Sequence, residues 1–183
     1  MNLAADYLTA GGFTEIMSNS LTKESYYEGL TSYPAARCVR ILNPLSADLN
    51  VMRQTLLFNT MEAVQLNANR RNGNLRLYEF GNCYFYDEAA RDAEKPLSAY
   101  SEQYRLAIAV TGAAVPQSWN AKPQASSFFT LRAVAEKLLR RFGLDIYALK
   151  CEPLQSDLFG DGISLSAGNG RELLQMGVVA PRI

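Results

Sequence analysis

The spacing of apolar residues along the chain predicts three helices. In residues 55–71 the apolar positions recur every three or four residues, which places them on one face of a helix. Residues 131–142 have the same periodicity, and Gly143 follows them as a helix-ending glycine. A shorter helix is predicted for residues 2–10, where Gly11 and Gly12 supply the stop.

Shorter segments of alternating, β-branched or aromatic residues predict strands. They are residues 13–21, 38–42, 51–54, 75–86, 104–111, 147–152, 163–167 and 172–180. The strand at 75–86 has the clearest pattern because aromatic side chains cluster in it, and Gly81 in its middle predicts a bulge or a bend. Asn169 and Gly170 predict a type I′ hairpin turn between the last two strands.

The order of these elements predicts the fold class. The strands follow one another or are joined by hairpin turns, and no regular alternation with crossover helices appears. This arrangement favours a mainly antiparallel sheet flanked by helices, which is an α+β fold. The length of 183 residues suits a single domain with its own core, so we expect residues 1–183 to form one domain.

Charge is balanced, with 18 basic and 18 acidic residues. A protein that binds nucleic acid by itself usually carries a basic excess that neutralises phosphates. We therefore expect most contacts to any RNA to come from other domains. No apolar run approaches the roughly 20 residues of a membrane span, and residues 1–12 are too polar for a signal peptide. We expect a cytoplasmic protein with no membrane partner.

The chain contains no histidine, which excludes several kinds of catalytic and metal site. Nucleophile systems built on histidine, histidine-liganded zinc and histidine general-base chemistry are all unavailable. The three cysteines, Cys38, Cys83 and Cys151, lie far apart without a C-x-x-C pair. Such an odd, unpatterned set indicates buried reduced thiols, in preference to disulfides or a metal site.

Several segments resemble one family. Residues 12–16, which follow the first helix, resemble the opening of motif 1 in class II aminoacyl-tRNA synthetases. Residues 43–57 and 69–81 resemble the beta subunit of phenylalanyl-tRNA synthetase. Trp119, followed by Phe128-Phe129 and an amphipathic helix, fits the order found in that family. The resemblance covers nearly the whole chain.

The resemblance implies a role inside a larger enzyme. Residues 1–183 are similar to the catalytic-like module of the beta subunit, a class II core-like fold, cut from a longer chain before the end of that module. The family's alpha subunit carries the working active site, and the two subunits form a heterotetramer. The whole enzyme joins phenylalanine to its tRNA with ATP and magnesium. The module would then need no cofactor of its own and would support the alpha subunit.

The resemblance also implies that this module is not catalytic. Motif 2 of a class II core ends in an arginine that binds the α-phosphate of ATP, and the matching stretch here is Tyr84, Phe85, Tyr86 and Asp87. Phe85 stands at the place of the arginine, and a phenyl ring cannot make charge-assisted bonds to phosphate. We expect neither a catalytic residue nor a metal site. A stand-alone adenylate-forming ligase and an amino-acid-binding module remain the alternatives.

Two further sets of residues are candidates for structural roles. Residues on the motif 1 side would contact the alpha subunit, or else cover their own sheet: Leu3, Tyr7, Leu8 and Phe13. In isolation this surface would favour a weak homodimer. Glu79 shares strand parity with Leu77 and so points inward, where we expect a structural pair with Arg53. The run 168–171 superficially resembles motif 3, but no helix follows it.

Overall fold

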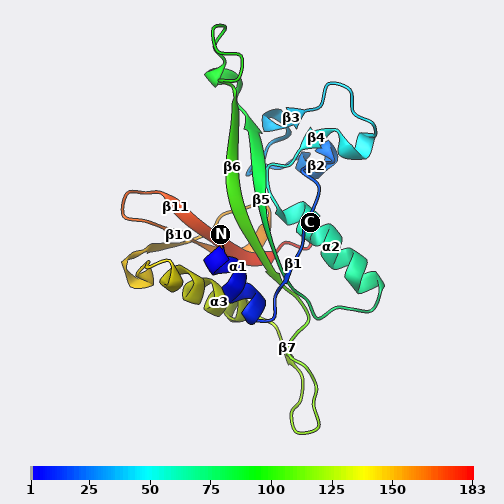
Figure 1. Cartoon of the computed structure of the whole chain (residues 1–183), viewed down its shortest axis with the longest axis vertical. Coiled ribbons are helices and arrows are strands. Elements are labelled where there is room, and N and C mark those ends of the chain that lie inside the picture. Colours follow the sequence, from blue (N-terminus) through cyan, green and yellow to red (C-terminus); the bar gives the residue numbers. More distant parts are fainter. Residues whose placement is uncertain (1) are drawn as a thin grey trace. The chain divides into compact units, whose positions relative to one another are not determined.

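The computed structural model describes residues 2–183, and the chain divides into two compact units. The first unit combines Met1–Thr14, Gly73–Arg76 and Ala109–Ile183, and the second combines Glu15–Asn72 and Leu77–Ile108. Figure 1 shows the elements of both units. That they are parts of one module, cut from a longer chain, stays a prediction.

The second unit is built on a sheet with the order β1-β5-β6. Its strands are β1 (Thr14–Glu15), β5 (Arg76–Tyr86) and β6 (Tyr100–Val110), and the division into units falls within all three. Leu75 and Thr111 exchange backbone hydrogen bonds before β5, and Asp87 bonds Ala99 after it. These two pairs share one antiparallel register, so the ladder continues past Gly81 without an inserted residue. The predicted bulge or bend at Gly81 is therefore wrong.

A smaller sheet and one helix complete the second unit. The sheet has the order β2-β4-β3 and is antiparallel throughout, with β2 at Leu21–Thr22, β4 at Val51–Met52 and β3 at Val39–Arg40. Helix α2 follows at Leu57–Asn69. Single 3-10 turns lie at Glu24–Tyr27, Ala35–Arg37, Ala47–Leu49 and Glu88–Ala90.

The predicted strand at residues 13–21 forms only at its two ends, as β1 and β2. Ile16 still donates its backbone N–H to the carbonyl of Tyr78 on β5. Two residues later the backbone N–H of Ser18 binds a side-chain oxygen of Glu79 at 3.0 Å. A carboxylate thus takes the place of a ladder bond, which ends the strand early.

The first unit packs a helix on an antiparallel sheet (Figure 1). The sheet order is β11-β10-β9, with β9 at Lys150–Pro153, β10 at Phe159–Ser166 and β11 at Glu172–Val179. Helix α3 (Phe128–Arg141) buries Ala135 against Leu165 and Met176 of this sheet. Helix α1 (Asn2–Ala10) contacts α3, and a 3-10 turn lies at Ile146–Ala148.

A two-stranded arm also belongs to the first unit. It consists of β7 (Ala113–Val115), β8 (Gln124–Ala125) and the loop between them, and we call residues 113–125 the arm. The sequence predicted no strands here, because neither run is long enough to show an alternating pattern.

The turn between β10 and β11 differs from the type I′ prediction. Of Asn169 and Gly170, the central residues of the predicted turn, only Gly170 has a positive φ, of 79°. A type I′ turn needs a positive φ at both central residues. Gly170 donates its N–H to the carbonyl of Ala167, and Ala167 donates to Arg171. This is the three-residue loop in which glycine takes the left-handed position after an ordinary turn. Asn169 instead accepts the N–H of Arg171 with its side chain, at 3.0 Å.

The α+β prediction is confirmed. Across residues 2–183 the structure has three α-helices, all close to the predicted ranges, and its small sheets pair in antiparallel fashion. None of the described helices is both long and apolar enough to cross a membrane.

Candidate functional site: the buried face of strand β5

Alternate residues of β5 turn one face of the strand into the interior of the second unit. Glu79, Cys83 and Phe85 are 1%, 0% and 6% exposed. Their neighbours Tyr84 and Tyr86 are half-buried on the opposite face, because successive side chains of a strand point to opposite sides. Of the three consecutive aromatics Tyr84, Phe85 and Tyr86, Phe85 therefore lies on the buried face. Tyr84 and Tyr86 therefore do not line the buried face together with Phe85.

Phe85 sits in an apolar cluster. Its ring packs with Leu56, which precedes α2, and with Cys83 on the same strand. Tyr33 and Ala107 pack against this cluster from its edge. Burial raises the pKa of the Cys83 thiol, as expected for a group in apolar surroundings. The environment of Phe85 is that of an apolar core.

Two guanidinium groups nevertheless lie against the Phe85 ring. The central carbon of Arg37 is 5.4 Å from the ring centroid and that of Arg105 is 5.3 Å away. Such contacts are favourable because the face of the ring is electronegative. Arg105 also donates to the Tyr33 hydroxyl at 3.1 Å and to the Gln103 amide at 2.7 Å. Neither arginine forms an ion pair within residues 2–183.

The sequence did not reveal these two arginines as neighbours of Phe85. Arg105 lies in a predicted strand, but the sequence does not indicate which residues of β5 this strand faces. Arg37 comes from the short turn Ala35–Arg37, which has no periodicity. Only the fold brings them together.

The structure brings Arg53 and Glu79 together as an ion pair with 2.7 Å between Nη1 and Oε1. Both side chains are almost fully buried, at 4% and 1% exposure. Ser18 donates to Glu79 through its backbone N–H at 3.0 Å and its hydroxyl at 2.9 Å. Arg53 donates Nε to the carbonyl of Asn82 at 3.0 Å. The carboxylate is thus neutralised and hydrogen-bonded on both oxygens, which leaves it no acid–base role.

Gly81 makes room for this ion pair. A Cβ atom at Gly81 would lie 2.0 Å from Nη2 of Arg53 and 3.0 Å from a methyl of Leu56. Residue 81 must therefore lack a side chain so that the guanidinium can cross the strand. This close approach, and not a bulge or a bend, requires glycine at position 81.

Asp87 and Tyr86 organise the turn after β5. Asp87 accepts the N–H of Ala89 at 3.1 Å and so caps the 3-10 turn Glu88–Ala90. The Tyr86 hydroxyl donates to the Glu88 carboxylate, which raises the pKa of Tyr86 and lowers that of Glu88. These contacts are local and structural, and they leave Asp87 without a ligand-binding role.

The four residues proposed for a partner contact differ in exposure. Leu8 and Phe13 are 0% and 6% exposed, so both are buried within this chain and offer a partner no surface. Leu3 is 46% exposed, and Tyr7 is half-buried with the Arg141 guanidinium 4.8 Å above its ring. The candidate contact therefore narrows to Leu3 and Tyr7.

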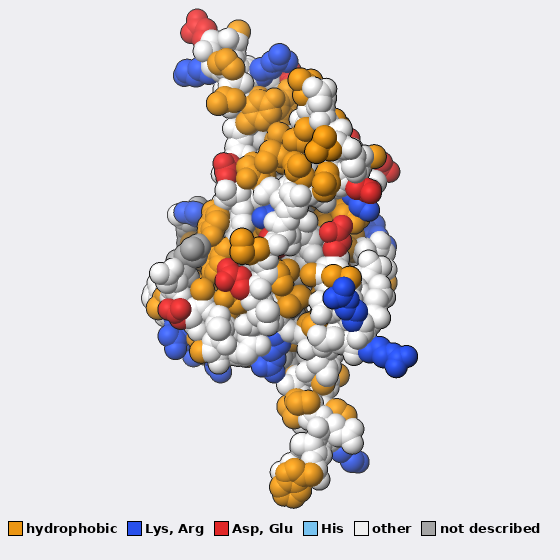
Figure 2. Space-filling view, turned by 45° about the vertical axis from the view of Figure 1, so that its right-hand side comes forward, with side chains coloured by type: hydrophobic (Ala, Val, Ile, Leu, Met, Phe, Trp, Pro, Cys, Tyr) orange, Lys and Arg blue, Asp and Glu red, His pale blue; other side chains and the backbone are white. Residues whose placement is uncertain are grey.

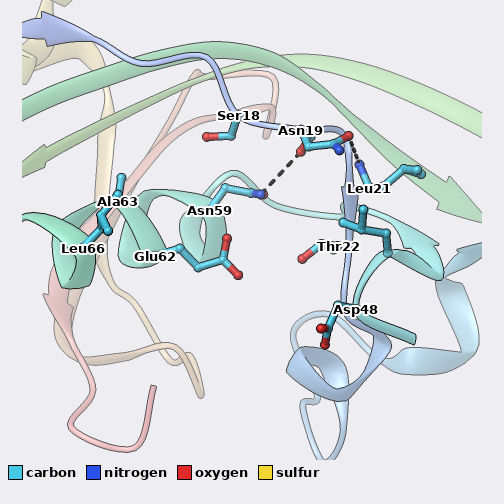
Figure 3. A pocket seen from close by; sticks show the side chains of 10 residues that line it. Ser18, Asn19, Leu21, Thr22, Asp48, Asn59, Glu62, Ala63 and Leu66 are labelled. Carbon is cyan, nitrogen blue, oxygen red and sulfur yellow. Dashed lines mark hydrogen bonds between the residues drawn. The ribbon is translucent and has the colours of Figure 1, made fainter. Parts of the chain in front are cut away.

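A separate pocket of about 290 Å³ opens between α2 and the segment 18–22 in the second unit (Figure 3). Its lining residues are Ser18, Asn19, Leu21, Thr22, Asp48, Leu49, Asn59, Glu62, Ala63 and Leu66. Asn59 bridges it by donating to the carbonyl of Asn19 at 3.4 Å. Glu62 accepts from the Tyr26 hydroxyl at 2.6 Å; burial and this bond raise the pKa of Tyr26 to about 12. No lining residue lies on β5, so the pocket is separate from the surroundings of Phe85.

Comparison with known proteins decides the family. A family model described as the phenylalanyl tRNA synthetase beta chain CLM domain matches residues 1–183. The chain belongs to this family. The match confirms the resemblance drawn from residues 43–57 and 69–81.

Relatives in this family are similar over the whole chain. The phenylalanine–tRNA ligase beta subunit of Bacteroides thetaiotaomicron is 45% identical over 100% of this chain and 22% of its own length. The corresponding subunit of Porphyromonas gingivalis is 39% identical over 99% of this chain and 22% of its own length. The chain thus spans about a fifth of the length of the curated relatives it matches.

A solved structure shares the fold. The pyrrolysyl tRNA synthetase of Desulfitobacterium hafniense matches 95% of this chain and 55% of its own, with a TM-score of 0.61 and 16% identity. At that identity the likeness concerns the fold alone. It confirms the prediction of a class II aminoacyl-tRNA synthetase core-like fold.

Proposed function

We propose that this chain is the non-catalytic core-like module of a phenylalanyl-tRNA synthetase beta subunit, and that it supports an alpha subunit that carries the active site. The observation that carries the proposal is the burial of Phe85, which the resemblance places where a class II core has its phosphate-binding arginine. Its ring is 6% exposed and packs with Leu56 and Cys83. A position filled in this way has no donor for a phosphate.

The residues around Phe85 do not fit ATP and magnesium. Magnesium prefers carboxylate oxygens and keeps several waters, but Glu79 is buried and bonded to Arg53 and Ser18. No cluster of three or more His, Cys, Asp or Glu residues that would suit a metal occurs in residues 2–183. The donors of Arg105 are directed at Gln103 and Tyr33. We therefore derive no reaction step in this module.

The rest of the proposed enzyme supplies the chemistry. ATP and magnesium act at the alpha subunit, and tRNA is bound mainly through other domains, because this chain has as many acidic as basic residues. The complex is a cytoplasmic heterotetramer that charges tRNA with phenylalanine. Within it the module provides a rigid surface for assembly.

Two measurements test the proposal together. The chain, co-expressed with a tagged alpha subunit, should be retained with it at stoichiometric yield. The isolated chain should show no heat of binding on calorimetric titration with ATP and magnesium at concentrations up to about 1 mM, where weak ligands are still detected. Binding at or below that concentration would contradict the non-catalytic assignment.

Phenylalanine provides the test of the alternative, an amino-acid-binding module. A ligand that binds only the folded chain raises the midpoint of thermal unfolding. We expect no rise with 10 mM phenylalanine, taken as roughly ten times a millimolar dissociation constant. A rise of several degrees would favour the binding module over the scaffold.

A further inference from the structure

The pocket between α2 and the segment 18–22 has an apolar wall and an acidic rim. Its lining residues carry two carboxylates, Asp48 and Glu62, and no basic side chain. Figure 3 shows Glu62 extending from α2 into the space, with Asp48 across from it. The side chains of the apolar wall are Leu21, Leu49, Ala63 and Leu66. Figure 2 shows how apolar and charged side chains alternate on one face of the molecule.

Two almost fully buried polar residues of the pocket have groups without a hydrogen-bond partner. Thr22 is 3% exposed, and its hydroxyl has no such partner within residues 2–183. Asn59 is 6% exposed, and its Oδ1 accepts no hydrogen bond from the described part of the chain. Buried polar groups normally have partners, because leaving one without a bond costs its desolvation free energy. Such groups in the wall of an open pocket indicate a ligand that supplies donors.

The donors beside the pocket are already used within the second unit. Ser18 donates its hydroxyl to the Glu79 carboxylate at 2.9 Å. Asn59 donates Nδ2 to the Asn19 carbonyl at 3.4 Å. The backbone N–H of Leu21 donates to the Asn19 side chain at 3.0 Å. The groups that remain toward the space are chiefly oxygen atoms, so a ligand that fits them must be rich in donors.

Glu62 is the carboxylate whose charge is left to pair. It accepts the Tyr26 hydroxyl, a neutral donor, at 2.6 Å, and it forms no ion pair among the described residues. Asp48, in contrast, lies 3.3 Å from the ammonium of Lys23. These three charged side chains together leave one negative charge uncompensated. The local field therefore favours a ligand with a single positive charge.

The arrangement of the oxygens separates three kinds of cation. A divalent metal ion needs more oxygen ligands, and no group of three or more His, Cys, Asp or Glu residues suits a metal in residues 2–183. A guanidinium is planar and prefers two parallel bonds to one carboxylate. Here the oxygens come from opposite sides, Glu62 from α2 and Thr22 from β2 (Figure 3). A compact ammonium group, with three donors, matches that arrangement.

We propose that this pocket binds a small primary alkylammonium ion. The ammonium group donates to the Glu62 carboxylate and to the Thr22 hydroxyl, and the alkyl chain lies against Ala63 and Leu66 of the apolar wall. The volume of about 290 Å³ is at the lower end for ligand pockets and suits a short chain. The inference does not depend on the scaffold role. A lysine side chain of another protein has the same chemistry, and the experiment distinguishes these two sources.

Calorimetric titration with n-butylammonium chloride tests the site. The probe replaces sodium chloride at constant ionic strength, so that the screening of charges stays equal. We expect one saturable site with a dissociation constant of about 1 mM or tighter. n-Butanol has the same alkyl chain without the charge, and it should give no saturable heat at the same concentrations.

Matched variants assign the binding to the pocket. Glu62→Gln removes the charge at constant size and should weaken binding about tenfold, as for the loss of a charged hydrogen bond. Thr22→Val removes the hydroxyl, keeps the shape and should weaken binding about threefold. Glu28→Gln is the control and should leave the dissociation constant unchanged, because Glu28 is an exposed acid of the same unit outside the pocket. The thermal midpoint of each variant without ligand shows that it is folded.

Nα-acetyl-lysine methylamide identifies the source of the ammonium group. It carries the same butylammonium chain on a short piece of peptide backbone. Binding as tight as that of n-butylammonium supports a lysine side chain of another protein as the source. Binding of n-butylammonium alone supports a free amine, because the backbone then does not fit. Either result supports the ammonium site itself.

Three outcomes would overturn the proposal. The first is a titration without saturable heat at n-butylammonium concentrations up to about 10 mM. The second is equal binding of n-butanol, which would show that the pocket takes an apolar chain and ignores the charge. The third is an equal loss of affinity in Glu28→Gln and Glu62→Gln, which would show attraction by the surface as a whole. None of them affects the scaffold role, which retention by the alpha subunit tests separately.

Discussion

Phe85 shows how one side chain can join a core and still lie beside charge. Its ring packs with Leu56 and Cys83, while Arg37 and Arg105 lie within 5.4 Å of its centroid. Cation–π attraction favours each of these contacts, but it does not neutralise the charge of either guanidinium group. Any further positive charge at residue 85 would therefore meet both an apolar environment and two like charges.

We predict that Phe85→Arg restores no adenylation and destabilises the chain. The new charge would be buried without a carboxylate partner, which costs about 3–5 kcal/mol of the free energy of unfolding. Urea denaturation measures the loss, and phenylalanine-dependent pyrophosphate exchange measures activity. Phe85→Leu is the control: it keeps an apolar core and should cost about 1–2 kcal/mol. Exchange activity in the arginine variant would show that the site is more intact than we propose.

The three thiols should differ in reactivity. Cys38 and Cys83 are 2% and 0% exposed, whereas Cys151 is exposed, so the expectation of three buried thiols holds for two of them. Burial raises the pKa of both buried thiols above the ordinary 9.0, and only the thiolate reacts. Ellman's reagent at pH 8 should therefore modify Cys151 quickly and the other two only after unfolding.

The same shifts fix the sign of the pH dependence of stability. Because the folded pKa is raised, the stabilisation from these thiols is fully present below pH 9.0 and is lost as pH rises above it.

Cys151→Ser is the control for the assay with Ellman's reagent and should abolish the fast phase. Fast modification of more than one thiol in the folded chain would contradict the burial of Cys38 and Cys83.

At the scale of elements, the sequence predicts the helices far better than the short strands. Residues 131–142 repeat their apolar pattern often enough to define one face of a helix, and α3 forms there. The helix begins earlier, at Phe128, because the backbone N–H of Ser127 donates a hydrogen bond to the Thr130 hydroxyl and so caps its first turn. The segment 13–21 alternates as a strand should, but Ser18 donates its backbone N–H and its hydroxyl to the Glu79 carboxylate in place of a neighbouring strand. A tertiary contact of this kind leaves no mark on the local pattern.

The candidate site was predictable to the extent that it follows from strand parity. Parity placed Glu79 on the buried face of β5, and the Arg53–Glu79 pair forms as expected. Phe85 has the same parity and is buried as well. Parity also places Tyr84 and Tyr86 on the face opposite Phe85. Arg37 reaches the ring from a turn without periodicity, so no local signal indicated it.

Arg53 and Glu79 should stabilise each other within the second unit. Ser18, in the segment after β1, also donates its hydroxyl to the Glu79 carboxylate. Arg53→Met leaves a buried carboxylate unpaired, and Glu79→Gln leaves a buried guanidinium unpaired. Each should cost about 3–5 kcal/mol of the free energy of unfolding. The double variant should cost less than the sum by at least about 1 kcal/mol. Urea denaturation of all four proteins measures this coupling, and strict additivity would show that the pair contributes no mutual stabilisation.

At the scale of the whole molecule, the chain spans about a fifth of the length of the curated relatives it matches. The exposed apolar side chains include Leu3 on α1, at 46%, and Leu66 on α2, at 52%. Permanent subunit interfaces bury roughly 2,000 Å² or more, and such surface tends to find a substitute partner when it is bared. Class II cores pair through the motif 1 region, which the resemblance places at residues 2–21.

We therefore predict a weak homodimer of the isolated chain, with residues 2–21 in or beside the contact. Leu3→Asp should shift the equilibrium toward monomer, because it places charge on the exposed side of α1 without disturbing the core. Leu66→Asp is the matched control, with similar exposure on another helix, and should leave the equilibrium unchanged. Leu8→Asp should instead unfold the chain, since Leu8 is 0% exposed. Sedimentation equilibrium over a wide concentration range measures the association. A single monomeric species at every concentration would contradict the prediction. It would mean that the surface formed by residues 2–21 does not associate by itself and that the subunit contact depends on other residues.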